Sequence, residues 1–323
     1  MRLAALLMIY SVLALASPVH AQQFGELESK GPRLDKQQTQ RLQVGVVVTA
    51  QGGPCKGIVG TTPVPIDWPE QQVKIVEEDF SPSVRNVNYR MIAGTVKQMT
   101  INMPFIPANE QCRAVVTFEI KRSSLLPPED TSIFVLPNPK KLKSDIRIYL
   151  GPSPYIESTH PKIRGYAKEL LGPKEDADKK NAWTKVETIY DWVRSKIEYK
   201  NGPIKGALQA LKDGTGDCEE LTDAFIAVCR ASEIPARVVW VPGHCYPEFY
   251  LEDKEGKGYW FPCQAAGTRD FGGISEFRPI LQKGDNFQVP ERKDRQRYIA
   301  EHLTGAGGRP SVEFIRTAVA EKP

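Results

Sequence analysis

The feature that most constrains this chain is the run Gly216-Asp217-Cys218-Glu219-Glu220 and the helix it opens. Asp217 is a favourable N-cap residue rather than a candidate acid, and Glu220, three positions later, completes a capping-box pattern with it. Apolar residues then recur at helical spacing as far as about Ala231, which predicts a helix with one buried face. Cys218 is therefore expected in the first turn, where free N–H groups and the helix dipole favour a thiolate.

A histidine follows this helix in the order that a thiol–imidazole pair needs. The run Ala236–Val241 is strand-like, His244 begins a second strand-like run, and a third, 257–264, ends at Gln264. Two strands joined by a short polar loop predict a hairpin beside the helix. The hairpin would bring His244 to Cys218.

These blocks resemble the core of the transglutaminase-like superfamily, which is papain-related in architecture. The resemblance rests on Gly-Asp-Cys-Glu-Glu, Ile-Pro-Ala-Arg-Val-Val, His-x-x-x-Glu-x-Tyr-Leu and Trp-x-Pro, between about Tyr155 and Gln264. It implies that Cys218 is the acyl-accepting nucleophile and His244 its base. The family's third residue is an Asp that orients the histidine, and here Gln264 stands at that position.

A glutamine changes what the third position can do. Its side-chain oxygen can orient an imidazole, but it cannot stabilise an imidazolium by charge as a carboxylate does. Glu248 is a second candidate for orienting His244, because four residues along an unbroken strand return to the same face. The predicted catalytic set is Cys218, His244 and Gln264, with Glu248 as the alternative to Gln264.

The fold class predicted for the chain is α+β, in two domains. Short β-branched and alternating runs separated by Pro- and Gly-rich connections predict an antiparallel β-sandwich over residues 40–145. Helical periodicity begins near Tyr155, and residues 150–290 are expected to form helices packed on an antiparallel sheet. The tail, 291–323, is expected to carry a charged helix over Glu291–His302 and a strand over Ser311–Thr317.

The first residues predict export. Arg2, an apolar run and a small-residue site ending at Ala21 are typical of a signal peptide over residues 1–21, followed by a flexible leader over 22–39. An uncleaved anchor is the alternative, although the apolar run is shorter than the ~20 residues that a membrane span requires. The expected location is secreted or periplasmic, with no membrane span after cleavage.

Export permits disulfides among the six cysteines. Cys55 and Cys112 could bridge within the first domain. A hairpin that sets His244 opposite Gln264 would also set Cys245 opposite Cys263, which predicts a cross-strand thiol pair or disulfide. Cys229, three helical turns after Cys218, is expected in the core.

Composition restricts the partners. A formal net charge of +4 on 323 residues gives no reason to expect a nucleic-acid or membrane partner. The expected partner is a peptide or protein substrate, and the chemistry requires no cofactor.

The leading hypothesis is acyl transfer or amide hydrolysis on a peptide or glutamine-type amide, through a thioester on Cys218. A protein of another class is the alternative, an exported binding or scaffold protein that keeps the fold but lacks the acidic third residue. A metal site built from Cys218, His244, Cys245 and Cys263 is a third hypothesis, although the spacing is not that of a structural zinc site.

Overall fold

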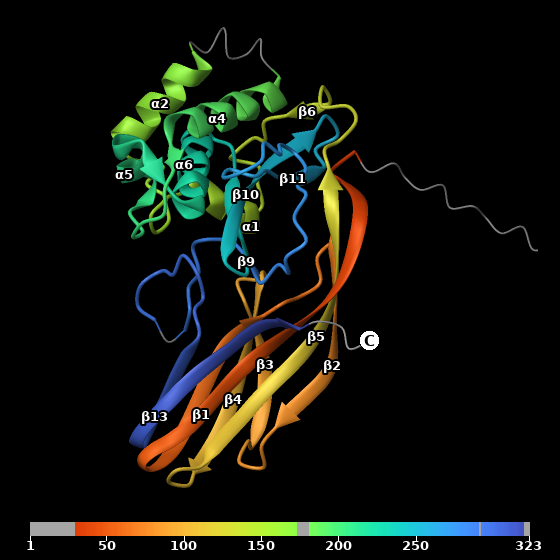
Figure 1. Cartoon of the computed structure of the whole chain (residues 1–323). Helices are drawn as coiled ribbons and strands as arrows, with labels where there is room; N and C mark the ends of the chain where they lie inside the picture. The colour runs from red at the N-terminus through yellow and green to blue at the C-terminus, as the bar shows by residue number, and fades with distance from the viewer. Residues whose placement is uncertain (1–29, 173–180, 291, 320–323) are drawn as a thin grey trace, which may run out of the picture.

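The computed structural model describes residues 30–172, 181–290 and 292–319. Figure 1 shows two bodies, a long β-sheet half and a half in which helices cover a smaller sheet. The predicted signal peptide and residues 22–29 lie outside the described residues. The last part of the predicted flexible leader is wrong, because residues 33–39 already belong to a strand whose backbone pairs with a neighbour.

The first half is built on one very long strand, β1. Its opening part pairs with β5 from Arg33 to Thr49, and its closing part pairs with β4 from Cys55 to Val64. A break in register between Gln51 and Cys55, with two glycines at positive φ, separates the two parts. The strands run in the order β2-β5-β1-β4-β3, and β13 also pairs with β1. Their bounds are β1 Arg33–Val64, β2 Gln71–Phe80, β3 Asn86–Ile92, β4 Val96–Ile106, β5 Gln111–Leu126 and β13 His302–Val319.

Both parts of β1 contribute to one apolar core. Inward side chains of β1, β4 and β5 pack together, as their alternating sequence predicts. The antiparallel strands expected in this half are confirmed. Hydrogen bonds join them into a single six-stranded sheet, and residues from both parts of β1 belong to the same apolar core. Cys55 and Cys112 are free, buried thiols within it, so the predicted bridge between them is absent. Cys55 lies opposite Ile106 and Cys112 opposite Val48.

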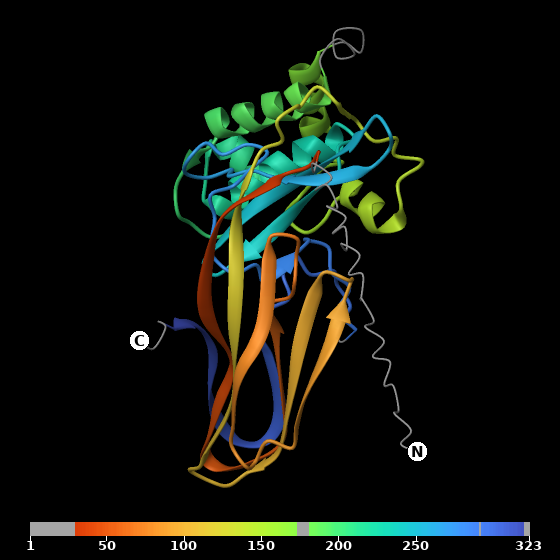
Figure 2. The same cartoon turned by 90° about the vertical axis from the view of Figure 1, so that its right-hand side faces the viewer.

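The second half has helices on one face of an antiparallel sheet ordered β11-β10-β9-β12 (Figure 2). The short β6 also pairs with β10, so the connector after β5 packs against this sheet. Its strands are β6 Phe134–Val135, β9 Ala236–Val241, β10 His244–Asp253, β11 Gly258–Pro262 and β12 Gln282–Lys283. Its helices are α1 Ser144–Arg147, η1 Ile148–Leu150, α2 Pro161–Leu171, α4 Ala182–Lys196, α5 Gly206–Asp213 and α6 Cys218–Ala231. A two-residue parallel pair, β7 Glu198–Tyr199 with β8 Thr215–Gly216, precedes α6.

Helix α6 lies at the centre of this half. It contacts α2, α4, α5, β9 and β10, and its side chains from Glu220 to Arg230 are buried. Edge-to-face and stacked rings fill the space between α4 and the sheet, from Trp183, Phe249, Phe261 and Phe271. The predicted apolar face of α4 and the predicted core position of Cys229 are confirmed. This packing fixes the start of α6 relative to the start of β10.

The tail returns to the first half. The strand predicted over Ser311–Thr317 is confirmed as part of β13, which pairs with β1 from Arg41 to Thr61. The charged helix predicted over Glu291–His302 is wrong, because residues 292–301 form bends and irregular backbone with one isolated bridge, from Gln296 to Phe287. Ile299 is the one fully buried side chain among them, too little apolar surface for a stable helix face.

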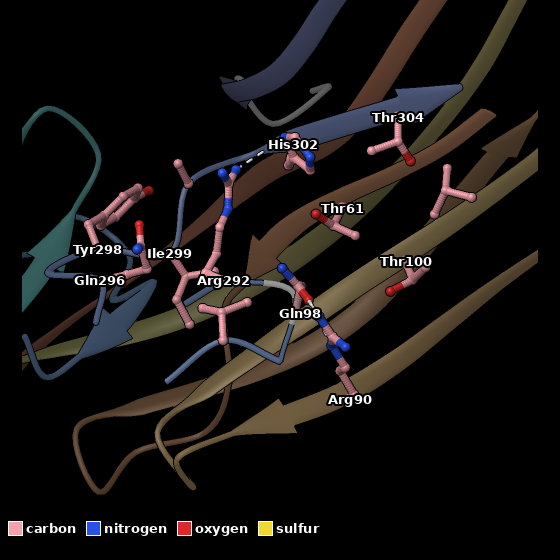
Figure 3. Close-up of a pocket in the computed structure, with 13 residues that line it drawn as sticks. Thr61, Arg90, Gln98, Thr100, Arg292, Gln296, Tyr298, Ile299, His302 and Thr304 are labelled. Atoms are coloured by element: carbon pink, nitrogen blue, oxygen red, sulfur yellow. Dashed lines mark hydrogen bonds between the residues drawn. The ribbon is translucent and has the colours of Figure 1, made fainter. Parts of the chain in front are cut away.

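A cavity of about 220 Å³ lies where this segment crosses β1 and β4. Figure 3 shows Arg292 beside His302 on one side and Arg90 beside Gln98 on the other. Within the described ranges, no helix has the length and apolar character needed to span a membrane.

Candidate active site

Cys218 is the first residue of α6, as the capping pattern predicts. The Asp217 carboxylate accepts a hydrogen bond from the Glu219 N–H at 2.8 Å, and the Glu220 carboxylate accepts one from the Asp217 N–H at 2.9 Å. This reciprocal box fixes the first turn and leaves the half-buried Cys218 thiol at the positive end of the helix.

The approach to Cys218 requires glycine. A Cβ on Gly216 would lie 2.5 Å from the Glu220 Cβ, so any side chain at position 216 would disturb the capping box. The same segment is held from the other side, since Tyr199 pairs with Gly216 and the Lys200 N–H donates to the Gly216 carbonyl at 2.8 Å. The loop before the nucleophile is thereby fixed on both sides.

His244 and Gln264 meet, as predicted. His244 begins β10, and its Nε2 lies 2.8 Å from the Gln264 Oε1. A carboxamide oxygen only accepts hydrogen bonds, so Nε2 carries the proton and Nδ1 is left for the nucleophile. The His244 side chain hydrogen-bonds to Cys218, which completes the set Cys218, His244 and Gln264.

The backbone of Gln264 is held on both sides. Its carbonyl accepts from the Tyr190 hydroxyl at 2.7 Å and from Arg194 at 3.0 Å, and its N–H donates to the Asp270 carbonyl at 2.8 Å. Two residues of α4 therefore set the direction of the Gln264 side chain. The sequence carries no signal for this role, since Tyr190 and Arg194 read only as one core and one surface residue of a helix.

Cys245 is the residue that the sequence misplaces. The pKa of Cys218 is lowered to about 4, first by a hydrogen bond from the Cys245 thiol and then by His244 and the Cys245 N–H, against burial that raises it. The same contact and full burial raise the pKa of Cys245 well above its usual range, so Cys245 remains a protonated donor. Cys245 faces α6, with its Sγ 3.9 Å from the Thr222 Oγ1.

The ionisation of His244 matches that of Cys218. Burial lowers the pKa of His244, but hydrogen bonds to Cys218 and Gln264 raise it above its ordinary value overall. The lowered pKa of Cys218 favours its thiolate, and the raised pKa of His244 favours the protonated ring relative to a free imidazole.

The predicted Cys245–Cys263 pair is wrong. Glu248 lies opposite Pro262 and Glu252 opposite Gly258, so the hairpin register differs by two from the one that would set Cys245 against Cys263. All six cysteines are free, and the Cys263 Sγ lies 3.9 Å from the Pro247 carbonyl.

Glu248 does not orient His244. Its carboxylate is buried between Arg237, at 2.8 Å, and Lys283, at 2.5 Å. Both cations hold the pKa of Glu248 below its usual value in spite of its burial. Glu248, the alternative to Gln264, therefore serves in buried ion pairs and not in orienting His244.

Two acidic side chains of α6, Glu219 and Asp223, lie near Cys218, and the sequence does not predict their environments. Glu219 forms an ion pair with Arg297, which the segment before β13 delivers. Burial raises the pKa of Glu219 to about 7, against the attraction of Arg297. Asp223, one turn further along α6, is fully buried with an unpartnered Oδ2, and burial raises its pKa well above its usual range.

The metal hypothesis has no geometric support in the part of the chain that the structure describes. No group of three or more His, Cys, Asp or Glu side chains converges there at metal-binding distance. The Cys263 thiol instead contacts the Pro247 carbonyl.

Comparison with known proteins agrees with this geometry. Residues 165–265 match the model of the transglutaminase-like superfamily, a segment that includes Cys218, His244 and Gln264. No curated protein matches the chain.

Two solved structures are similar. A candidate cysteine protease from Cytophaga hutchinsonii is 18% identical, with a TM-score of 0.57 over 90% of this chain and 95% of that one. The periplasmic domain of TgpA from Pseudomonas aeruginosa is 13% identical, with a TM-score of 0.33 over 69% of this chain and 89% of that one. The first of these shares the fold over almost the whole chain. The family match and the arrangement around Cys218 thus indicate a transglutaminase-like domain over residues 165–265.

Proposed function

We propose that the chain is a thiol enzyme that transfers or hydrolyses an acyl group through a thioester on Cys218. The observation that carries the proposal is the contact of His244 with Cys218, which lowers the pKa of Cys218, with the imidazole held by Gln264. A neutral carboxamide in this place is compatible with catalysis, since papain-like proteases use a Cys-His-Asn set. The family match supports the proposal.

The chemistry follows from the positions of the groups. The Cys218 sulfur attacks the carbonyl carbon of a peptide or glutamine-type amide, and the carbonyl oxygen becomes an oxyanion. The backbone N–H of Cys218, at the positive end of α6, is the group that would stabilise that charge, since the capping box uses those of Asp217, Glu219 and Glu220. His244 gives its Nδ1 proton to the departing amine, which leaves a thioester on Cys218.

Water or an amine then attacks the thioester. His244, now neutral, accepts a proton from the attacking molecule, and the thiolate leaves as the acid or the new amide forms. Hydrolysis and transamidation differ only in this second nucleophile. The substrate we propose is a peptide or protein, and the enzyme requires no cofactor for these steps.

The experiment uses two measurements on the wild type, Cys218→Ser and His244→Ala. Alkylation by iodoacetamide as a function of pH, with mass spectrometry of the Cys218 peptide, reports the thiolate. Glutamine-containing peptides are then incubated with and without a primary amine. We expect a thioester on Cys218, and either peptide products of hydrolysis or products that carry the amine.

A binding protein without catalysis is the second candidate, and the neutral Gln264 is the observation that favours it. In that case Cys218 still alkylates at low pH but no thioester or product accumulates with any peptide. Alkylation that is slow below pH 8 and indifferent to His244→Ala would refute the poised pair itself.

We also propose that the protein is exported, on the basis of residues 1–21. Cell fractionation and the N-terminal sequence of the mature protein test this. A mature chain that begins at Met1 in the cytoplasm would contradict it.

A further inference from the structure

A second cavity lies at the junction of the two halves. Its volume is about 920 Å³, near the upper end of the range for small-molecule sites. Three separate parts of the chain form it: the start of β1, the loop from Trp68 to Glu70, and the β10–β11 hairpin with its neighbours. Figure 1 shows these elements meeting where the small sheet approaches the top of β1 and β5.

The cavity is separate from the candidate active site. On β9, Ala236 and Val238 belong to the core shared with α6, so the intervening Arg237 points to the other face of the sheet. On β10, Phe249 likewise faces α6, and Glu248 faces away. Since Arg237 and Glu248 line the cavity, a ligand there has the sheet between itself and Cys218.

The floor of the cavity is a chain of buried ion pairs. Glu70 contacts Lys283 at 2.7 Å, Lys283 contacts Glu248 at 2.5 Å, and Glu248 contacts Arg237 at 2.8 Å. All four side chains are at least nine-tenths buried, and they join the loop of the first half to the sheet of the second. Charges in this position are costly to bury and are fully paired, which gives the cavity a rigid, polar floor.

Aromatic and apolar groups form the walls. The Arg237 guanidinium lies 4.0 Å from the centre of the Trp260 ring, and the Lys283 ammonium 4.8 Å from that of Trp68. These contacts fix both indoles on the floor. Leu34, 58% exposed, adds an open apolar surface at the mouth. A flat apolar body would bury these surfaces.

Lys257 supplies positive charge at the mouth. The lining includes four cations, Arg33, Arg237, Lys257 and Lys283, and two carboxylates, Glu70 and Glu248. Arg237 and Lys283 pair with those two carboxylates, and Arg33 pairs with Glu129. The exposed Lys257 ammonium lies over the Tyr259 ring and has no carboxylate partner among the residues the structure describes. An anionic group on the ligand would find its counter-charge there.

We propose that this cavity binds an organic anion with a planar apolar body, such as an aromatic carboxylate or sulfonate. Its body packs between Trp68, Trp260 and Leu34, and its anionic group pairs with Lys257 at the mouth. The site is distinct from the thiol site and does not depend on the function proposed for that site.

The probe for the experiment is anilinonaphthalene sulfonate, an aromatic sulfonate whose emission rises when it enters an apolar site. It is titrated into the full chain, the wild type and four variants. Leu34→Glu and Lys257→Glu alter the mouth of the cavity. Met91→Glu, on β3, and Lys254→Glu, in the same hairpin loop but not in the lining, are the matched controls.

We expect Leu34→Glu and Lys257→Glu each to weaken probe binding by about fivefold or more, and the two controls to leave it unchanged. Benzoate should displace the probe, and benzyl alcohol should not. Equal affinities in Lys257→Glu and Lys254→Glu, or loss of probe binding after alkylation of Cys218, would overturn the proposal. Displacement only by an acidic peptide would assign the cavity to a macromolecular partner instead.

Discussion

Cys245, through its thiol and backbone N–H, and the preceding residue His244, the proposed base, both lower the pKa of Cys218. Strand alternation sends Cys245 toward α6, where the first turn places Cys218. One dipeptide at the start of β10 thus supplies both the base and a neutral donor to the thiolate. Two consecutive residues can serve one nucleophile here because β10 begins at the N-terminal end of the helix.

Replacement of the donor thiol should raise the pKa of Cys218. A hydrogen bond to a charged group is worth about 1.5–3 kcal/mol, or roughly one to two pKa units. We expect Cys245→Ala to move the midpoint of Cys218 alkylation upward from about pH 4 by that amount. Cys245→Ser, which keeps a donor, should move it less. Identical profiles for Ala, Ser and the wild type would show that the thiol does not stabilise Cys218.

Gln264 should control the alkaline limit of the reaction. The pKa of His244 is raised in part by Gln264, and a carboxylate in its place would favour the imidazolium further. We expect Gln264→Glu to extend thiolate–imidazolium reactivity to higher pH. Gln264→Ala should lower the rate of thioester formation by roughly 10²-fold, since the imidazole loses its orientation.

The comparison is made on the full pH dependence of single-turnover thioester formation. Tyr190→Phe is the informative companion, because it removes one hydrogen bond to the Gln264 carbonyl and leaves the Gln264 side chain intact. A small loss in Tyr190→Phe with an unchanged pH profile would fit a positioning role. If Gln264→Ala behaves as the wild type, His244 needs no orienting residue.

Local signals predicted the start of α6 well. Asp217 and Glu220 encode their own helix start within a few residues, and the structure confirms both hydrogen bonds of the box. The contact of His244 with Gln264 is also confirmed, although the predicted register is wrong. The contact forms in spite of the wrong register because Gln264 lies beyond the paired residues of β10 and β11. Its backbone is held there by α4 rather than by β10.

The position of Cys245 shows why the register of the β10–β11 hairpin could not be predicted from the sequence. The side chain of Asp253 accepts from the Glu255 and Lys257 N–H groups, so the hairpin turn is centred one residue later than the loop composition suggests. A turn displaced by one residue moves each cross-strand partner by two, which separates Cys245 from Cys263. Side-chain hydrogen bonds within a turn are not readable from residue types alone.

The contacts that the tail makes with distant parts of the chain could not be predicted from the sequence either. Arg297 reads as one cation in a charged run, and its partner Glu219 precedes it by most of the second domain. The charge pattern of residues 291–302 is compatible with an exposed helix, but β13 pairing with β1 sets the path of this segment. Such pairing depends on the complete fold of the first half.

The Arg297–Glu219 contact should give the active site a second titration. The pKa of Glu219 is raised to about 7, so a negative charge develops beside Cys218 as pH rises through that value. That charge disfavours the thiolate, and we expect the alkylation rate to show an inflection near pH 7. Glu219→Gln should remove the inflection. Arg297→Met should shift it upward, because the cation lowers the pKa of Glu219.

The Arg230–Asp285 ion pair does not involve Arg297. Arg230 lies in the last turn of α6, so Arg297→Met leaves this pair intact. An inflection that persists in Glu219→Gln would assign it to another group, and a flat rate through pH 7 in the wild type would show that Glu219 does not sense Cys218.

The buried Asp223 should make the folded protein less stable at neutral pH than a variant with an amide at this position. Burial raises the folded-state pKa of Asp223 well above its unfolded value, so the folded state favours the protonated form. The penalty is therefore absent below the unfolded pKa of ~3.9 and grows as pH rises toward the folded pKa. Asp223→Asn keeps the shape of the side chain and removes its charge. A neutral amide group then occupies the position of the unpartnered Oδ2.

We expect Asp223→Asn to raise the free energy of unfolding by about 1–3 kcal/mol at pH 7. The gain should shrink as pH falls toward 4. Urea denaturation at a series of pH values measures it, with Asp213→Asn as the matched control on an exposed carboxylate. Hydrogen bonds and Lys205 lower the pKa of Asp213, so its substitution should change stability with the opposite slope against pH. If the two variants show the same slope, burial of Asp223 does not control its ionisation.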